Sequence, residues 1–572
     1  MQTAHSPLGV YIFTPTAPNG VHTSQNAHYI TEILGHAGVP YRLLETEALP
    51  ALLESGIKIL LTSGNGVLES AASEAIKSWV ETGGQWLSLG SVCGLEEVLG
   101  VETVPSPGIA TRPNFYPYGS IGEGYLKPLV AHPIFEQIVI PLHFYNGYRV
   151  KTGAGSVLAS ALDYHGRETE TPVVIEAIHG QGRTLFIAAD VVDAVIRIQQ
   201  GTAVTCDGVS APDGSAPVAD GVLKCDDGLV LDWYFDRQEI PETNGLKGFL
   251  QPVADQWREL ILRAIFHFAG QQDIALPVLW LYPRNLPAMA HISHDTDGND
   301  LEKGKRLLEV MGEAGIHSTW CTITPGYPRD FMEKIKAAGH ELSLHYNALD
   351  HPWSEEEFDA QYKELVELFG EQPISNKNHY TRWENGTEFF DWCARRNIWI
   401  EQSKGPSKPG EIGFTFGSGQ LYFPLADDGT IHTVLEQPLH SQDLRIVSPP
   451  SVVPVLLDAI EKHHGILHLL FHPAWILTDG VADSLLDSVR QGKERGMEWV
   501  TARWLNDWER SRRAVEWKGI TSQAQPAVEL TELAEATVLV LGRHEKIEVN
   551  GELHAAQTTT RWGFEFSFVT LS

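Results

Sequence analysis

The first part of the chain, residues 1–272, alternates between short apolar runs and longer amphipathic stretches. Residues 57–62 (IKILLT) are almost continuously apolar, which is typical of a strand buried on both faces of a parallel sheet. The amphipathic stretch 69–82 ends at Gly83-Gly84, where glycine can supply the cap of a helix. This alternation predicts a doubly wound parallel-sheet α/β domain. Further strands are expected at 10–13, 85–89 and 184–189, and further helices at 26–37 and 255–269.

Residues 201–248 interrupt this alternation. They are rich in Asp, Gly, Ala and Pro and show no sustained period, so a long loop insertion is expected there. Residues 277–287 contain two short extended pieces and are expected to form a linker.

A second alternation begins at Ala288. About seven strand–helix units follow one another at the spacing of a (β/α) barrel. The strands are expected at 290–293, 317–323, 341–345, 399–402, 433–437, 466–471 and 497–501. The helices are expected at 301–314, 328–338, 354–369, 386–396, 451–463, 482–495 and 505–515.

The last segment has no helical period after Ala536. Strands are expected at 537–541, 546–549 and 563–569, with Asn550-Gly551 as a hairpin turn. The pattern as a whole therefore predicts an α/β protein of three domains. These are a doubly wound domain at 1–272, a barrel at 273–518 and a small all-β domain at 519–572.

Charge and hydropathy narrow the range of partners. The chain has 42 Lys and Arg against 73 Asp and Glu, a net charge of −31. Such a surface repels phosphate backbones and anionic lipid, so neither nucleic acid nor a membrane is expected as a partner. No apolar run approaches the roughly 18 residues that cross a bilayer. Residues 1–9 lack the basic and apolar regions of a secretory signal, so a cytoplasmic location is expected.

The five cysteines are too few for a disulfide framework in a chain of 572 residues. Cys206 and Cys225 lie in the same insertion, where a disulfide between them and two unpaired thiols are both compatible with the sequence. Unpaired thiols are the favoured interpretation.

The segment Ser293-His-Asp-Thr-Asp-Gly298 follows an apolar strand. Asp295 and Asp297 are two residues apart, so in an extended chain their side chains point to the same side. Two neighbouring carboxylates repel each other unless a cation lies beside them, and a divalent metal is the usual one.

The segment Gly339-His-Glu-Leu-Ser-Leu-His345 is followed six residues later by His351. On a helix, six residues turn through about 240°, so the two imidazoles would not share a face. If His345 ends a strand and His351 lies in the next loop, both can reach one point, while His340 is expected to face elsewhere. Two imidazoles and one carboxylate with an open position suit Zn²⁺ or a similar divalent ion.

These two segments resemble the first and second signatures of polysaccharide deacetylases, the NodB-homology domain of carbohydrate esterase family 4. That family folds as a distorted (β/α)7 barrel, in agreement with the strand count. The resemblance implies that Asp295 is the catalytic base and that Asp297, His345 and His351 bind the metal. The Asp-x-Asp form and the six-residue His spacing differ from the commonest forms and are similar to those of some peptidoglycan-deacetylase-like members.

Later segments fit the same family pattern. Asn378-His-Tyr-Thr-Arg-Trp383 lies where the family carries an arginine that orients the base, which makes Arg382 the candidate, although the usual Arg-x-Pro is missing. An ordinary salt-bridging arginine is an equal alternative. Leu469-Leu-Phe-His-Pro473 resembles the last signature and makes His472 the candidate general acid, with a core histidine as the alternative. The candidate substrate contacts are Trp353, Trp383 and Glu436, and buried packing is the alternative for both tryptophans.

The resemblance implies hydrolysis of an amide or ester. The metal polarises the acyl oxygen and lowers the pKa of a water, Asp295 takes the proton of that water, and His472 protonates the leaving amine or alkoxide. The expected substrate is an N- or O-acetylated saccharide. The alternatives are a small non-sugar amide, such as a ring amide or ureide, and a barrel that binds carbohydrate without hydrolysing it.

The pattern of residues 8–270 resembles the class I glutamine amidotransferase-like fold, in its non-catalytic form. A working amidotransferase needs a cysteine on a tight strand-to-helix turn and a partner histidine. Gly90-Ser-Val-Cys93-Gly94 is near that place but out of register, and no His-x-Glu follows late in the domain. The domain is therefore expected to shape the cleft, bind substrate or mediate homo-oligomer formation.

Overall fold

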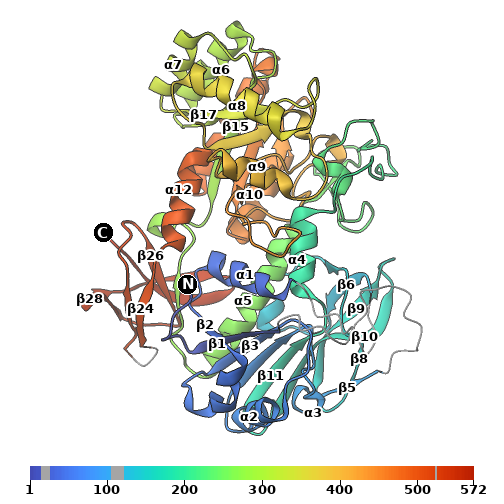
Figure 1. Cartoon of the computed structure of the whole chain (residues 1–572), viewed down its shortest axis with the longest axis vertical. Helices are drawn as coiled ribbons and strands as arrows, with labels where there is room; N and C mark the ends of the chain where they lie inside the picture. Colours follow the sequence, from blue (N-terminus) through green and yellow to red (C-terminus); the bar gives the residue numbers. More distant parts are fainter. Residues whose placement is uncertain (14–25, 105–121, 522–524) are drawn as a thin grey trace. The chain divides into compact units, whose positions relative to one another are not determined.

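The computed structural model of the chain describes residues 1–13, 26–104, 122–521 and 525–572 (Figure 1). These residues form two compact units. Unit 1 contains residues 1–195, 256–285 and 511–572, and unit 2 contains residues 196–255 and 286–510. This division differs from the three expected segments, because the 201–248 insertion belongs to the barrel unit and the C-terminal strands belong to unit 1.

Unit 1 is built on a mixed sheet of order β2-β1-β3-β4-β11-β10-β9-β6-β7. The first five strands of this order run parallel and the remaining pairs are antiparallel, so the expected parallel sheet forms one half of it. The apolar run at 57–62 is confirmed as a buried strand, β3. The strands are β1 (Leu8–Ile12), β2 (Arg42–Leu44), β3 (Ile59–Ser63), β4 (Gln85–Leu89), β6 (Gly124–Pro128), β7 (Leu142–Phe144), β9 (Ser156–Asp163), β10 (Glu168–His179) and β11 (Gly182–Ile187), with a separate pair β5 (Val101–Thr103) and β8 (Val150–Thr152).

The helices of this part of the chain are α1 (Ile30–Ala37), α2 (Ser70–Glu81), α3 (Glu96–Leu99), α4 (Val191–Gln200) and α5 (Val253–Gln271). α2 ends just before Gly83, whose φ of 117° suits glycine, as the sequence predicts. An apolar cluster that includes Ile76, Trp86 and Phe186 forms the core. Cys93 lies at the end of β4 and is fully buried, and burial raises the pKa of its thiol to about 11. Such a thiol is a poor nucleophile at neutral pH.

The C-terminal residues of unit 1 form two four-stranded sheets. In one of them β14, in the segment expected to be a linker, pairs antiparallel with β26. The Asn550-Gly551 hairpin is confirmed, since both residues have positive φ (52° and 83°) and join β27 to β28. The strands are β14 (Pro277–Leu279), β24 (Trp517–Thr521), β25 (Ala527–Leu530), β26 (Thr537–Leu541), β27 (Lys546–Val549), β28 (Glu552–Ala555), β29 (Gln557–Arg561) and β30 (Phe564–Thr570).

Unit 2 is built on a parallel sheet of order β20-β19-β18-β17-β16-β15-β22-β21, with β23 also paired to β15. All residues of this unit are described, and within it β20 and β21 do not pair with each other, so the sheet curves as an open barrel. The seven expected strands are present, and β18 and β21 are additional. The strands are β15 (Met289–Asp295), β16 (Thr319–Thr322), β17 (Glu341–Tyr346), β18 (Ser375–Asn378), β19 (Ile400–Glu401), β20 (Leu435–Glu436), β21 (Ser441–Gln442), β22 (Ile466–Leu470) and β23 (Glu498–Trp499).

The helices between these strands follow the predicted periods closely. α6 begins after Asp300, whose carboxylate accepts hydrogen bonds from the backbone N–H of Glu302 and Lys303, and it ends at Gly315 with a φ of 60°. Figure 1 shows α6, α7 and α8 together beside β15 and β17. The helices are α6 (Leu301–Ala314), α7 (Arg329–Ala337), α8 (Glu355–Phe369), α9 (Glu388–Arg395), α10 (Val452–Lys462), α11 (Val481–Glu494) and α12 (Ala502–Arg513).

The insertion, green in Figure 1, is mostly irregular, as expected. It contains the short ladder of β12 (Gln238–Glu239) with β13 (Lys247–Gly248). Backbone bridges attach it to the barrel of the same unit, for example from Val204 to Asn385 and from Lys224 to Arg382. Cys206 is exposed, Cys225 is buried, and both are free thiols. None of the helices in the described ranges is long and apolar enough to span a membrane.

Candidate active site

Two carboxylates stand at the carboxyl end of β15. The strand is buried along its whole length, and Asp295, its last residue, is only 4% exposed. Thr296 fixes the following turn, because its Oγ1 accepts a hydrogen bond from Ile323 N and donates one to Asn299 Oδ1. Asp297 has a φ of 37°, in the left-handed region that few non-glycine residues adopt and that strained active-site residues sometimes occupy.

His345 lies near the end of β17, two strands from β15. Its Nδ1–H donates to the carbonyl oxygen of Lys377 at 2.8 Å, which leaves Nε2 unprotonated in the neutral ring. Nε2 is buried without a hydrogen-bond partner in the structure and lies 3.4 Å from Asp297 Oδ1 and 3.8 Å from Asp295 Oδ2. A buried nitrogen lone pair held toward two carboxylates is the arrangement of a metal ligand.

His379 follows β18 and was not among the residues predicted from the sequence. Its Nδ1 lies 3.1 Å from Asn347 Oδ1, to which it can donate, and its Nε2 lies 3.8 Å from Asp297 Oδ1. One ligand atom each from Asp297, His345 and His379 lies within 4.8 Å of the other two. Two imidazole nitrogens and one carboxylate oxygen form the ligand set of many catalytic zinc sites, and the unpartnered Asp297 Oδ1 and His345 Nε2 fit that set.

The structure does not bring His351 to this group. Its side chain is 48% exposed, and its Nδ1 lies 3.2 Å from Glu357 Oε1 at the first turn of α8. His351 follows β17 by several residues, and the loop carries it toward the helix, whereas His379 is placed beside His345 by the adjacent strand.

Asp295 has a buried cation beside it. Lys377, on β18, is 1% exposed, and its Nζ lies 3.8 Å from Asp295 Oδ1 and donates to Ser293 Oγ at 2.7 Å. Ser293 Oγ in turn lies 2.9 Å from His468 Nε2. Asp295 Oδ1 is buried and accepts no hydrogen bond from the described residues, so Lys377 acts on this oxygen through charge.

His472 follows β22 and lies on another side of Asp297, with 3.7 Å between His472 Nε2 and Asp297 Oδ2. Its Nδ1–H donates to Asp443 Oδ2 at 2.6 Å, and its backbone N–H donates to Asp443 Oδ1. Burial alone would lower the pKa of His472, but the carboxylates of Asp443, Asp297 and Asp295 raise it to about 10. His472 is therefore placed and charged as a proton donor, and its partner Asp443 is, like His379, a residue that sequence reasoning missed.

The structure does not bring Arg382 to Asp295. Its guanidinium forms an ion pair with Glu384 and donates to the carbonyl oxygen of Leu223 at 3.3 Å. Arg382 thus holds the insertion against the barrel, while Lys377 occupies the position beside Asp295.

Trp353, Trp383 and Glu436 pack in the interior of unit 2. Trp383 is 1% exposed, and Trp353 is partly buried with its ring tilted against those of Tyr346, Phe389 and Trp392, which is the packing given above as the alternative. Glu436 is fully buried, and burial together with the neighbouring carboxylate of Glu401 raises its pKa well above the usual value.

A cavity of about 240 Å³ opens on the paired carboxylates. Its walls come from strand ends of the barrel, from the loop after β21 and from the insertion. The residues that line it are Asp220, Lys224, Asp295, Asp297, His379, Tyr380, Thr381, Ser407, Lys408, Gln442, Asp443, Val447, His472 and Trp475.

No protein-family model matches the sequence, and no curated protein matches it. Solved structures similar to parts of the chain include a protein from Mycobacterium smegmatis assigned as a polysaccharide deacetylase (15% identity, 42% of this chain and 95% of that one, TM-score 0.32). Another is PuuE allantoinase, with 14% identity over 40% of this chain and 92% of that one and a TM-score of 0.33. A third is the peptidoglycan deacetylase PdaC from Bacillus subtilis, with 12% identity over 41% of this chain and 96% of that one and a TM-score of 0.26. At these TM-scores the likeness decides nothing about the reaction, which is argued below from the site.

Proposed function

We propose that unit 2 is a metal-dependent hydrolase of an amide or ester. The observation that carries this proposal is the convergence of ligand atoms from Asp297, His345 and His379, two of which, Asp297 Oδ1 and His345 Nε2, are buried and accept no hydrogen bond from the described residues. Asp295 lies beside this set and the His472–Asp443 pair faces it. The proposed ligands are thus those expected from the sequence, with His379 in place of His351.

A divalent ion held there supplies a Lewis acid for the acyl oxygen and lowers the pKa of water. Asp295 accepts the proton of the attacking water, and Lys377 Nζ, 3.8 Å from Asp295 Oδ1, helps to orient this carboxylate. His472, with its Nε2 3.7 Å from Asp297 Oδ2, delivers its Nε2 proton to the leaving amine or alkoxide. Asp443 fixes the orientation of the imidazole through Nδ1.

The substrate class that we propose first is an N- or O-acetylated saccharide, of which one acylated sugar ring enters the cavity. A second candidate is a small non-sugar amide, such as a ring amide or ureide. The observation that favours the second is the size of the cavity, about 240 Å³, with a wall contributed by Asp220 and Lys224 of the insertion. Pockets for drug-sized ligands usually span about 300–1,000 Å³.

The metal is tested with single variants of the full chain. His345→Ala and His379→Ala are each expected to lose one bound Zn²⁺ per chain, whereas His351→Ala is the matched control and is expected to retain it. Zinc is measured by equilibrium dialysis and elemental analysis. Loss in His351→Ala with retention in His379→Ala would restore the ligand set expected from the sequence, and retention in all three would refute the site.

The reaction is tested with two substrate panels. Acetate release from acetylated sugars supports the deacetylase, and ring opening of cyclic amides or ureides without acetate release supports the second candidate. Both activities are expected to disappear on removal of the metal with a chelator and to return with Zn²⁺. A zinc-loaded chain that binds sugars but hydrolyses neither panel would instead support the non-hydrolytic carbohydrate-binding barrel.

A further inference from the structure

A second group of potential metal ligands lies in unit 1, outside the barrel. His132 precedes the short 3-10 helix η3 (Pro133–Phe135), Glu176 is on β10, and His267 is in the last turns of α5. One ligand atom of each lies within 4.8 Å of the other two. The residues are far apart in the sequence, and for that reason no motif reveals them.

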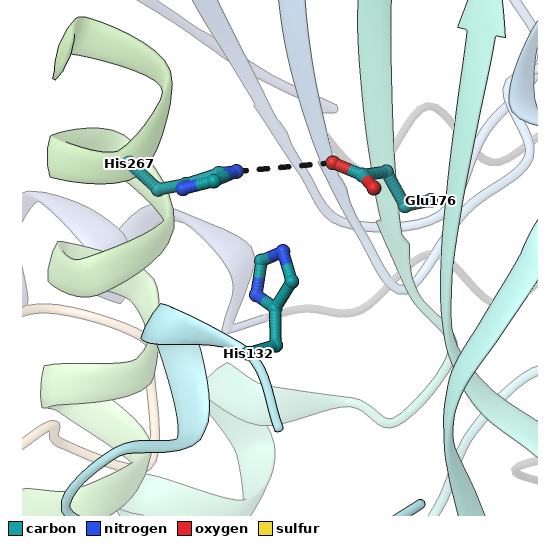
Figure 2. A group of neighbouring side chains, drawn as sticks. All are labelled: His132, Glu176 and His267. Atoms are coloured by element: carbon teal, nitrogen blue, oxygen red, sulfur yellow. Dashed lines mark ion pairs between the residues drawn. The ribbon is translucent and has the colours of Figure 1, made fainter. Parts of the chain in front are cut away.

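The side chains converge on one small space. Figure 2 shows the imidazole of His267 facing Glu176, with the outer nitrogen of His132 pointing toward the gap between them. His267 Nε2 lies 3.8 Å from Glu176 Oε1, too far for a hydrogen bond, and the two rings of His132 and His267 are 4.7 Å apart between centroids. The spacing leaves room for a cation that each group would contact at about 2 Å.

The surroundings of the Glu176 carboxylate favour a bound cation. Its Oε1 is buried and accepts no hydrogen bond from the described residues. Arg183 Nη1 is 3.8 Å from the same oxygen, which is also beyond hydrogen-bond reach. A buried carboxylate oxygen left without a partner costs free energy, and a bound ion is one of the ordinary explanations.

Two existing contacts would have to yield to an ion. Gln271 Nε2 lies 2.9 Å from His267 Nε2, and Gln271 is near the end of α5, where its side chain can turn away. His132 Nδ1 accepts from Ile134 N at 3.4 Å, a long and weak hydrogen bond. Neither contact anchors its imidazole strongly.

We propose that His132, Glu176 and His267 form a second divalent-metal site, selective for Zn²⁺ and similar borderline ions, that ties α5 and η3 to the sheet of unit 1. Two imidazole nitrogens and one carboxylate oxygen suit Zn²⁺ better than Mg²⁺ or Ca²⁺, which prefer oxygen ligands. The ion joins three elements that are remote in the sequence, so its binding stabilises unit 1 by mass action.

The test uses the full chain with His345→Ala and His379→Ala, which removes the proposed barrel ligands. Titration of this protein with Zn²⁺ alone by calorimetry is expected to show one equivalent. His132→Ala, Glu176→Gln and His267→Ala are each expected to weaken binding by more than about tenfold, since loss of even an outer partner of a ligand has that effect. His179→Ala is the matched control, because His179 is on the same strand and its side chain contacts Glu81.

Gln271→Ala separates a metal site from a structural imidazole cluster. It removes the competing contact and is expected to leave Zn²⁺ affinity unchanged or higher. Zn²⁺ is also expected to raise the unfolding temperature of the parent but not of Glu176→Gln, the variant that changes the side-chain volume least. Absence of binding in the parent, or equal binding in the parent and in all three ligand variants, would overturn the proposal.

Discussion

Asp297 is surrounded by imidazoles, with 3.4, 3.8 and 3.7 Å between its oxygens and the Nε2 atoms of His345, His379 and His472. Burial alone would raise the pKa of this carboxyl, but the imidazoles lower it to about 2. Asp295, two residues away, also lies 3.8 Å from His345 Nε2 but has Lys377 beside its other oxygen. The two carboxylates at the end of this strand therefore have different surroundings. Those of Asp297 suit a metal ligand, and those of Asp295 suit the catalytic base.

Asp295→Asn tests the base. This variant retains the ligand set but cannot accept a proton, so kcat is expected to fall by about 10²–10⁴-fold while the Zn²⁺ content stays unchanged. Steady-state hydrolysis and elemental analysis measure the two quantities on the same sample. Asp479→Asn, at an exposed position beyond the site, serves as the control. A variant that loses zinc together with activity would place Asp295 among the ligands instead.

The His472–Asp443 pair predicts a pH dependence of stability in the metal-free protein. The pKa of His472 is about 10 in the folded chain, above the value near 6.5 of a free histidine. Its contribution to stability is therefore complete below about pH 6.5 and is lost as the pH rises through about 10. Urea unfolding of wild type should show this loss between those limits, and Asp443→Asn should show less of it. If the free energy of unfolding changed equally with pH in the two proteins, the proposed effect of Asp443 on His472 would be wrong.

At the scale of elements, the helices and most strands of unit 2 were predictable because their apolar residues recur with a clear period. β18 was missed because its sequence, Ser-Asn-Lys-Asn, is polar although every residue in it is buried. Because this strand was not predicted, neither Lys377 nor His379 was recognised as a site residue. Both are brought to the site by the carboxyl end of β18. β21, two residues long, hid Asp443 in the same way. Lys377 of β18 lies beside Asp295, and Gln442 of β21 lines the cavity, so polar residues that obscured these strands in the sequence belong to the site.

Lys377 lies beside Asp295, whereas Arg382 contacts the insertion, and two variants can test these different roles. Lys377→Met leaves Asp295 without its cation, so kcat should fall with little change in KM. Arg382→Ala removes the contact to Leu223, so the insertion should become more sensitive to proteolysis and KM should rise more than kcat falls. Limited proteolysis and steady-state kinetics measure these effects. If Arg382→Ala lowered kcat and Lys377→Met mainly raised KM, Arg382 would be the residue that orients the base, as expected from the sequence.

At the scale of the whole molecule, each unit has its own apolar core, one including Trp86 and the other including Trp320. Pattern reasoning found both α/β regions but not their borders, since hydrophobic periods report local structure and not which strands pair at long range. β14 shows this: its partner β26 is more than 250 residues away in the sequence.

Separate cores predict two unfolding transitions in calorimetry. Gly38→Ala tests the assignment, because Gly38 has a φ of 73° and an added Cβ would lie 1.9 Å from the carbonyl oxygen of Leu279 in the same unit. The unfolding temperature of unit 1 is expected to fall, corresponding to a loss of about 1–3 kcal/mol or more in its free energy of unfolding. The unfolding temperature of unit 2 is expected to stay unchanged. A single transition that shifts as a whole would show that the units unfold together.

The pairing of β14 with β26 also governs the order of events during synthesis. The ribosome releases residues 277–279 about 260 residues before their partner, a delay of roughly 13 to 50 s at ~5–20 residues per second. Every residue of the barrel emerges within that interval, so the barrel can finish folding while unit 1 still exposes an unpaired strand. Premature termination near the C-terminus would consequently damage the half of the protein that was made first.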